Sequence, residues 1–519
     1  MKQFLLLFSL FFLFATSSGQ RHKYYFVNKV LPEFRNAPKQ QFSSLQTLSQ
    51  IALKPGDTIF FYAGDTLTGN ISLSNIHGTK EQNIVLTSFG GGNAIISGNN
   101  KEALVIAKSS HFQLLNLQFI GAGRKEGNTT DGVKVNGCED FSITNVEISG
   151  FQKSGLILYN SQHAEVNKVF AHENGFAGIL VEGDYQKRNS NAIHLINCRA
   201  VNNPGDPTNL NNHSGNGILV GNCKNVLVEY CTATNNGWDM PRIGNGPVGI
   251  WAYEADSVTI QHCISYRNKT AKGAADGGGF DLDGGVTNSV IQYCLSYENW
   301  GSGYGIFEYP DAGRWDNNTL RYCISINDGF ITDYASGMLI WNGWGVDSLV
   351  TRFYAYNNLF YNDRKYAFAF IYPSNHRQFA FLNNIFIASD TSDIFYGVDS
   401  SRSDFFLGNV WMRKSGGFAQ SGFTDLEKWA QATGYEVQQN RLVGASSHRR
   451  LFFAAPHINV EDPYLLKTDP VLKSFCIAAF NHKGVDPRKL FSIDVGRTDF
   501  FGAVIPLHGR MSAGICERR

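Results

Sequence analysis

The chain has 519 residues, with 45 Lys or Arg, 44 Asp or Glu and a formal net charge of +1 at pH 7. This balance argues against a nucleic-acid partner, which would require a basic stripe, and it gives no sign of a strongly polyanionic substrate. With 43% hydrophobic and only 17% charged residues, the composition fits an elongated β protein with a large core.

The N-terminal 1–19 segment indicates a secretory signal peptide. Lys2 supplies a positive start, residues 4–15 form an apolar run, and residues 16–20 are small or polar, as at a cleavage site. No other stretch approaches the roughly 18 apolar residues needed to cross a bilayer. We therefore expect a secreted protein, periplasmic or extracellular, without a membrane span and monomeric. Residues 20–50 are expected to cap the N-terminal end of the fold that follows.

The middle of the chain repeats a short apolar phrase that ends in cysteine. The cysteines of this phrase lie 29 to 33 residues apart: Cys198, Cys231, Cys263, Cys294 and Cys323. A second phrase, Gly followed by an apolar residue as in Gly249-Ile250, usually precedes the cysteine position by 13 or 14 residues. Repeats of this period indicate a solenoid, and units this rich in β-branched residues are too short for helix pairs. We predict an all-β chain in which each repeat is one coil of a parallel β-helix.

The repeated cysteines are predicted to be thiols. If the coils stack about 4.8 Å apart, neighbouring Cβ atoms lie beyond the roughly 3.8 Å that a disulfide prefers. Nine cysteines in an exported protein would ordinarily suggest disulfides. The register instead favours an inward column of small hydrophobic side chains, and the absence of a C-x-x-C pair argues against a metal site there.

The beginning of the repeat region carries a resemblance to a known group of proteins. The segment Lys54–Asp65, followed by Gly78-Thr79 and residues 83–90, looks like an opening coil. With the repeats, it resembles the right-handed parallel β-helix proteins of the pectate-lyase-like superfamily. The resemblance implies a right-handed β-helix over residues 51–415. It leaves function open, because that superfamily includes lyases, hydrolases, esterases, epimerases and adhesins.

Paired aspartates are the sharpest candidates for chemistry. Asp281 and Asp283 stand two apart on one predicted strand, hence on one outward face, with Cα atoms about 6.6 Å apart. Carboxyls this close push their pKa values apart, which leaves one as a proton donor. Glu308 lies one coil on and could complete a catalytic set, or its alternation could bury it. The aspartates could instead accept backbone bonds in a Gly-rich turn, or bind calcium together with Asp276.

Aromatic and basic side chains are predicted beside these carboxyls. Trp251, Tyr253 and Trp341 fall on outward positions and could stack on sugar rings, or pack under a long loop. Arg242 and Lys272 lie on adjacent loops and are candidates for substrate binding. The superfamily resemblance gives them a second reading, since its lyases often use Lys or Arg as the base with calcium neutralising a uronate. A solvated loop face explains both basic residues equally well.

Two further residues near the predicted groove have simpler interpretations. Glu254 ends the strand of Trp251 and is a reserve carboxylate candidate, although carboxylates at strand ends often form turns. His213 lies in an Asn-rich turn, from which it could reach the groove, but we expect it at the surface.

The repeat ends near residue 415, and residues 416–519 are predicted to form a C-terminal cap. The end of a solenoid exposes a hydrophobic cross-section that needs covering. Within the cap, residues 424–433 predict a short helix, with Thr424 as N-cap and Leu426 and Trp429 three positions apart.

These features favour a secreted polysaccharide-active enzyme, specifically a glycoside hydrolase with paired carboxylates. Carboxylates outnumber any Lys or Arg on the predicted strand face, which ranks hydrolysis first. The alternatives are a calcium-assisted polysaccharide lyase or uronate epimerase, and a non-catalytic glycan-binding solenoid or adhesin. The expected partner is a polysaccharide or oligosaccharide, and no cofactor is required unless the aspartates bind calcium.

Overall fold

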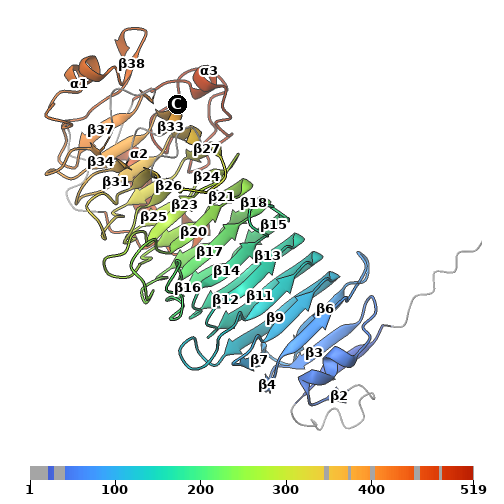
Figure 1. Cartoon of the computed structure of the whole chain (residues 1–519). Coiled ribbons are helices and arrows are strands. Elements are labelled where there is room, and N and C mark those ends of the chain that lie inside the picture. The colour runs from blue at the N-terminus through green and yellow to red at the C-terminus, as the bar shows by residue number, and fades with distance from the viewer. Residues whose placement is uncertain are drawn as a thin grey trace, which may run out of the picture.

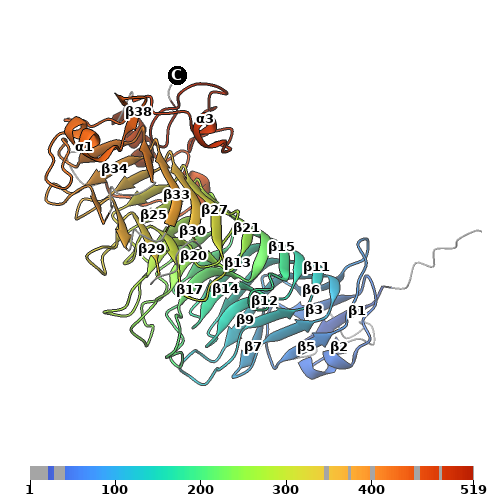
Figure 2. The same cartoon turned by 45° about the horizontal axis from the view of Figure 1, so that its top comes forward.

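The chain forms a long right-handed parallel β-helix, as the sequence predicts. The computed structural model describes residues 21–27, 41–343, 350–371, 376–397, 404–448, 456–478 and 482–517. The expected signal peptide, and residues 20 and 28–40 of the expected N-terminal cap, lie outside these residues. Figures 1 and 2 show the coils stacked along one axis, from the blue N-terminal end to the orange C-terminal end.

One side of the coil is a parallel sheet of 12 strands, one strand per coil. Its strands, in spatial order, are β5 (Ile71–Ser74), β8 (Leu104–Ala107), β10 (Val133–Asn136), β12 (Ser154–Tyr159), β14 (Ala177–Glu182), β17 (Asn216–Gly221), β20 (Val248–Tyr253), β23 (Gly278–Leu282), β26 (Tyr304–Glu308), β29 (Met338–Asn342), β32 (Phe368–Ile371) and β35 (Phe395–Tyr396). Six of them, β10, β12, β14, β17, β20 and β23, begin at the Gly-apolar phrases of the sequence. We call this sheet the site sheet, because its outer face carries the candidate site.

The remaining sides of the coil form a second parallel sheet of 25 strands. They are β1 (Lys23–Phe26), β2 (Gln41–Phe42), β3 (Thr58–Tyr62), β4 (Thr66–Thr68), β6 (Ile84–Phe89), β7 (Ala94–Asn99), β9 (Ser110–Gly121), β11 (Glu139–Ser149), β13 (Gln162–His172), β15 (Ser190–Ile196), β16 (Arg199–Val201), β18 (Cys223–Glu229), β19 (Thr232–Thr234), β21 (Asp256–Gln261), β22 (Ile264–Tyr266), β24 (Val290–Gln292), β25 (Leu295–Tyr297), β27 (Trp315–Arg321), β28 (Ile324–Ile326), β30 (Val350–Tyr356), β31 (Leu359–Tyr361), β33 (His376–Leu382), β34 (Ile385–Ala388), β36 (Phe405–Leu407) and β37 (Val410–Arg413). Side chains that alternate inward from both sheets fill one continuous core.

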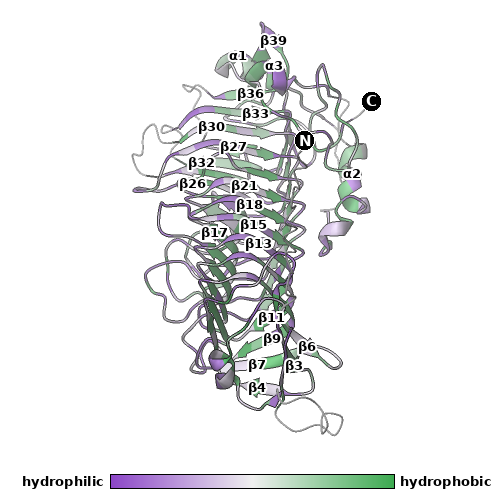
Figure 3. Cartoon of the chain, turned by 90° about the vertical axis from the view of Figure 1, so that its right-hand side faces the viewer, coloured by the Kyte–Doolittle hydropathy of each residue, from purple (hydrophilic) through white to green (hydrophobic). Residues whose placement is uncertain are grey.

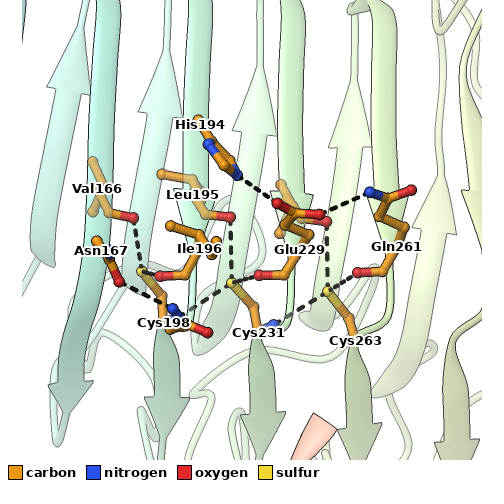
Figure 4. Close-up of polar contacts among 12 residues, drawn as sticks. Val166, Asn167, His194, Leu195, Ile196, Cys198, Glu229, Cys231, Gln261 and Cys263 are labelled. Atoms are coloured by element: carbon orange, nitrogen blue, oxygen red, sulfur yellow. Dashed lines mark hydrogen bonds and ion pairs between the residues drawn. The ribbon is translucent and has the colours of Figure 1, made fainter. Parts of the chain in front are cut away.

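The cysteine phrase forms an inward column of thiols, which confirms the prediction. All five cysteines are fully buried and unpaired. The backbone N–H of Cys198 contacts Sγ of Cys231 at 3.4 Å, and the N–H of Cys231 contacts Sγ of Cys263 at 3.4 Å (Figure 4). Each thiol donates to the carbonyl two residues earlier, as Cys263 does to Gln261 at 3.1 Å. Burial raises the pKa of the Cys198, Cys231, Cys263 and Cys294 thiols well above 9.0, so these four stay protonated and unreactive.

A second inward column consists of asparagines and holds the next corner of each coil. The side-chain amide of Asn236 donates to Asn268 Oδ1, Asn268 donates to Asn299, and Asn299 donates to Asp328, each at 2.9 Å. All four side chains are buried. Because a carboxylate accepts without needing to donate, Asp328 ends the column with every donor satisfied.

In the later coils, the residue just before each cysteine is aromatic and has a left-handed backbone conformation. Tyr230, His262, Tyr293 and Tyr322 have φ between 49° and 57°, which is uncommon outside glycine and asparagine. Their rings stack between neighbouring coils, with centroids 5.0 to 5.7 Å apart. We call this set the corner ladder.

The C-terminal segment, residues 456–517, runs back along the stack and covers the corner ladder. It contains η3 (Pro463–Leu465), α2 (Pro470–Ala478) and α3 (Pro487–Phe491), and Figure 3 shows it beside the coils. Tyr464 stacks on Tyr230 with centroids 4.4 Å apart, and the Tyr293 hydroxyl donates to the carbonyl of Thr498 at 2.9 Å. Cys476 and Cys516 form a disulfide within this segment, so two of the nine cysteines are paired.

Short elements close both ends of the core. Near the N-terminus, η2 (Leu45–Gln50) buries Leu45 and Leu48. After β37, α1 (Leu426–Thr433) packs Trp429 against Trp411 with ring centroids 5.5 Å apart, and the hairpin β38 (Val437–Gln438) and β39 (Arg441–Leu442) follows. The N-cap of α1 is Asp425, which accepts from Lys428 N–H, and not Thr424. No helix in the described part of the chain is long and apolar enough to cross a membrane.

Candidate active site

The candidate site arises where an outward column of the site sheet loses its apolar character. In the coils of β12, β14 and β17 this column is aliphatic: Ile157 pairs with Leu180, and Leu180 pairs with Leu219. The column continues through Trp251, Asp281, Gly305 and Leu339 in register. Adjacent coils therefore place a carboxyl, Asp281, next to a glycine, Gly305, in this column.

A cavity of about 850 Å³ lies over this break. Its floor comes from β20, β23, β26 and β29, and the loops that enter these strands form its walls. The volume falls within the range typical of small-molecule sites. The lining brings together six of the residues predicted from the sequence: Trp251, Tyr253, Asp276, Asp281, Asp283 and Trp341.

Asp281 presents a buried and unpaired carboxyl oxygen to the cavity. Only 2% of the residue is exposed, and Oδ1 has no hydrogen-bond partner among the described residues. The space around it exists because residue 305 is glycine: a Cβ there would lie 2.9 Å from Oδ1 and 2.7 Å from the Phe307 ring. Burial, then the neighbouring Asp283 and Asp276, raise the pKa of Asp281 well above 3.8. This shift favours the protonated form of the side chain.

Asp283 lies just beyond the end of β23 and is partly exposed to the same cavity. Its N–H donates to the carbonyl of Ala252 at 2.8 Å, and its Oδ1 accepts from the N–H of Gly284 at 2.8 Å. Burial raises the pKa of Asp283 to about 7, the Gly284 bond opposes the shift, and Asp276 and Glu254 add to it. Asp283 is thus poised to exchange a proton near neutral pH.

Asp276 lies on a loop in the cavity wall and not on a strand of the floor. Its Oδ2 accepts from the N–H of Gly246 at 2.8 Å, which ties two adjacent loops together. Burial raises its pKa to about 6, against the effect of the Gly246 bond. Above that pH its negative charge favours protonation of the two floor aspartates.

Glu308 does not reach the cavity. It follows Tyr304 and Ile306 on the inward alternation of β26 and is fully buried, whereas Phe307 between them lines the cavity. Its carboxyl accepts from the N–H groups of Tyr309 at 3.2 Å and Gly285 at 3.5 Å. Burial, then the charge of Asp283, raise its pKa to about 9. The structure therefore places Glu308 behind the wall, so it is not in position to touch a substrate.

Glu254 is also turned away from the cavity. It is 2% exposed and accepts from the N–H of Gly313 at 2.7 Å and from the side chain of Gln186 at 3.3 Å. These bonds give it the turn-forming role that the sequence left open.

The aromatic side chains are fixed by polar contacts at their ends. Trp251 is 4% exposed, and its indole N–H donates to Asn216 Oδ1 at 3.1 Å. The Tyr253 hydroxyl donates to Glu182 Oε2 at 2.5 Å; it crosses Gly221 to do so, where a Cβ would lie 2.2 Å from the ring. Trp341 is partly exposed and meets Phe307 edge to face.

His213 is a cavity residue, and the expectation that it lies at the surface is wrong. It is 8% exposed and lies edge-on to the Trp251 ring at 5.0 Å. The side-chain amide of Asn216 donates to Nδ1 at 3.0 Å. Burial, then the charge of Arg242, lower its pKa to about 4, so the ring is neutral at pH 7. Its Asn-rich surroundings suggested solvent, but the loop folds over the sheet.

Arg242 and Lys272, which are predicted to bind substrate, are not among the residues that line the cavity. The guanidinium of Arg242 donates to the carbonyl and side chain of Asn245 on its own loop. Lys272 is exposed to solvent. Within the described residues, the cavity lining includes no Lys or Arg at all.

One wall of the cavity comes from a contact that no local sequence pattern indicates. The loop after β14 reaches across to the loop after β26: the Tyr185 hydroxyl and the Gln186 side-chain amide both donate to the carbonyl of Asp311, at 3.3 and 3.2 Å. Tyr185 itself lines the cavity. We call residues 183–189 the bridge loop.

A comparison with protein families decides the relationship. The model of the Pel9A-like, right-handed β-helix region matches residues 35–332. The chain belongs to this Pel9A-like family. No curated protein matches the chain. Among solved structures, an alginate lyase from Paenibacillus sp. str. FPU-7 is 15% identical, with 68% of this chain and 95% of that chain covered and a TM-score of 0.37.

Two other solved structures show similar values. A GH136 lacto-N-biosidase from Eubacterium ramulus is 15% identical, with 73% of this chain and 67% of that chain covered and a TM-score of 0.40. A polygalacturonase from Erwinia carotovora is 12% identical, with 73% and 96% covered and a TM-score of 0.41. At this distance the similarity is one of fold.

The Pel9A-like match includes the coils that carry Asp276, Asp281 and Asp283, but it ends before Trp341. The three aspartates line one cavity, as the predicted calcium site requires. However, no three His, Cys, Asp or Glu side chains in the described parts of the chain are arranged so that they could hold a metal ion together. Asp276 Oδ2 already accepts a hydrogen bond from a loop N–H, so the three aspartates as placed here fit calcium poorly.

Proposed function

We propose that the protein is a glycoside hydrolase in which Asp281 is the general acid and Asp283 the base or nucleophile. The observation that carries the proposal is the pair of carboxyls on one cavity floor, with pKa values raised to different extents. Most glycosidases need one protonated and one ionised carboxyl on either side of the scissile bond. Asp281 favours the first state and Asp283 is ionised above about pH 7, which divides the two roles.

The rest of the cavity suits a sugar ring. Trp251, Phe307 and Trp341 offer apolar ring faces against which a pyranose can pack, while Asn212, Asn245 and Ser302 offer polar contacts at the walls. A mainly apolar pocket with a few convergent polar groups is the usual form of a small-ligand site. We accordingly propose a polysaccharide or oligosaccharide as substrate, acted on outside the cell if residues 1–19 direct export.

A calcium-assisted lyase is the second candidate, and the three cavity aspartates are the observation in its favour. A lyase also needs a base for the proton α to the uronate carboxylate. The cavity lining supplies no Lys or Arg for that step, and His213 is engaged by Asn216. The same lack of a cationic partner argues against uronate epimerisation.

The test is a panel of neutral and acidic glycans assayed with and without a chelator. Hydrolysis releases reducing ends without a rise in ultraviolet absorbance, and it should persist in chelator. Activity should rise with pH through about 7 as Asp283 ionises, then fall as Asp281 loses its proton. Asp283→Asn should lack the rising limb. Unsaturated products that require calcium would establish the lyase instead, and binding without turnover on every glycan would indicate a glycan-binding solenoid.

A further inference from the structure

The walls and floor of the cavity carry carboxyls but no cation. Asp276, Asp281 and Asp283 face it, and no described lining residue is Lys or Arg. Among the described residues of the lining, His213 is the only one with a basic ring, and it is neutral at pH 7.

Four cations near the cavity do not line it, and one of them, Lys365, donates to the carbonyl of the lining residue Thr332. Arg188 donates to the carbonyl of Gly285 at 2.6 Å and to Thr287 at 3.2 Å, where it supports the turn behind the cavity. Arg242 is bonded within its own loop, and Lys272 is directed to solvent. None of these side chains is in the lining against which a bound sugar would pack.

We infer that the cavity accepts an uncharged sugar unit and rejects a unit that carries a carboxylate. The inference deepens the proposed function, on which it rests for the assignment of the site to a glycan. A carboxylate that is buried without a cationic partner loses the free energy of hydration and gains no ion pair in exchange. Placing it beside carboxyls of the same charge is also unfavourable. A sugar hydroxyl can instead donate a hydrogen bond to the lining, because Asp281 Oδ1 is buried without a partner and lies 2.9 Å from where a Cβ on residue 305 would be.

Binding measured apart from turnover tests the inference. The wild-type protein is applied at low temperature to an array of neutral oligosaccharides (gluco-, xylo-, galacto- and N-acetyl-lactosamine types) and uronate oligosaccharides (galacturonate, mannuronate and glucuronate types). Hits are then titrated by calorimetry in chelator and, separately, in calcium. At least one neutral ligand should bind, and every uronate should bind roughly 10-fold more weakly or worse in both buffers.

A cation introduced into the wall sharpens the test. Leu339 lies in the outward column beside Gly305 and lines the cavity, so Leu339→Lys should improve uronate binding relative to neutral binding. Leu210→Lys is the matched control, since Leu210 is 63% exposed and does not line the cavity; it should change neither. A shift of equal size in both variants would mean that net charge, not the cavity, sets the preference, and would overturn the inference.

The remaining outcomes separate the two proposals. Uronate binding as tight as neutral binding, in chelator or only with calcium, overturns the inference, and so does an array with no ligand of either class. Neutral binding without hydrolysis of any neutral glycan leaves the inference standing and removes the proposed hydrolase activity.

Discussion

The inward columns of the coil repeat one residue type, whereas the outward column of the site sheet changes from coil to coil. Cys263 has a cysteine above and below it at the same depth. Asp281, by contrast, has Trp251 on one side and Gly305 on the other. Both columns obey the same register, so the difference is in the side chains and not in the backbone. In this solenoid the inward positions, where one residue type recurs, determine the fold, and the candidate site lies at outward positions where the residue type changes from coil to coil.

The largest effect is expected from substitution of the two carboxyls of the cavity floor. Asp281→Asn and Asp283→Asn should each lower turnover by roughly 100-fold or more, the usual scale of general acid or base catalysis. Steady-state kinetics on the substrate found in the glycan panel measures this. Asp494→Asn, whose side chain is 86% exposed, is the matched control and should retain wild-type rates. Near-normal activity in both cavity variants would place the chemistry elsewhere.

A smaller effect should follow when the glycine of the outward column is replaced by a residue with a side chain. Gly305→Ala places a methyl group 2.9 Å from Asp281 Oδ1 and 2.7 Å from the Phe307 ring, so the ring must move into the cavity. We expect kcat/KM to fall by about 10-fold, because misplacement of a reacting group costs rate steeply. The β-helix should keep its far-ultraviolet circular dichroism. Unchanged kinetics would show that the space above Asp281 is not used.

Inside the coil, one link of the thiol column should be replaceable at modest cost. Cys263→Ala should lower the free energy of unfolding by about 1–2 kcal/mol through a small cavity, with no effect on activity. Thiol titration of denatured, unreduced protein should find seven free thiols, since seven cysteines are unpaired and Cys476–Cys516 is bonded. Two or fewer free thiols would contradict the column.

The smallest effect concerns the stability cost of the acidic site. The pKa of Asp283 is about 7 in the folded chain against 3.8 ordinarily, so the folded state binds its proton more tightly than the unfolded state. Wild-type stability from this group is complete below about pH 4 and is lost as pH rises to about 7. The Tm of Asp283→Asn should therefore exceed that of wild type by an amount that grows over this range, by a few degrees in all. A difference that is constant with pH would contradict the raised pKa.

Much of this architecture is predictable because it is local and periodic. The cysteine spacing and the Gly-apolar phrase give the coil, its inward slot and the reduced thiols. The same alternation places Asp281 on the outward face, and it would have buried Glu308 if the phase of that coil had been certain. What periodicity cannot give is the path of loops between coils. His213 folds inward over Trp251, Arg242 bonds within its loop, and the bridge loop meets Asp311 some 125 residues away.

The C-terminal segment changes how the stack as a whole should come apart. In a simple solenoid each coil contacts only its neighbours, so the array behaves as a one-dimensional chain that can fray from either end. Here the Tyr464 hydroxyl bonds to Asn197, 267 residues earlier, and the segment crosses the stacked rings of the later coils. The C-terminal segment therefore connects coils that are far apart along the stack. We expect these coils to unfold together rather than one after another, so removal of the segment should destabilise the middle of the protein as well as its end.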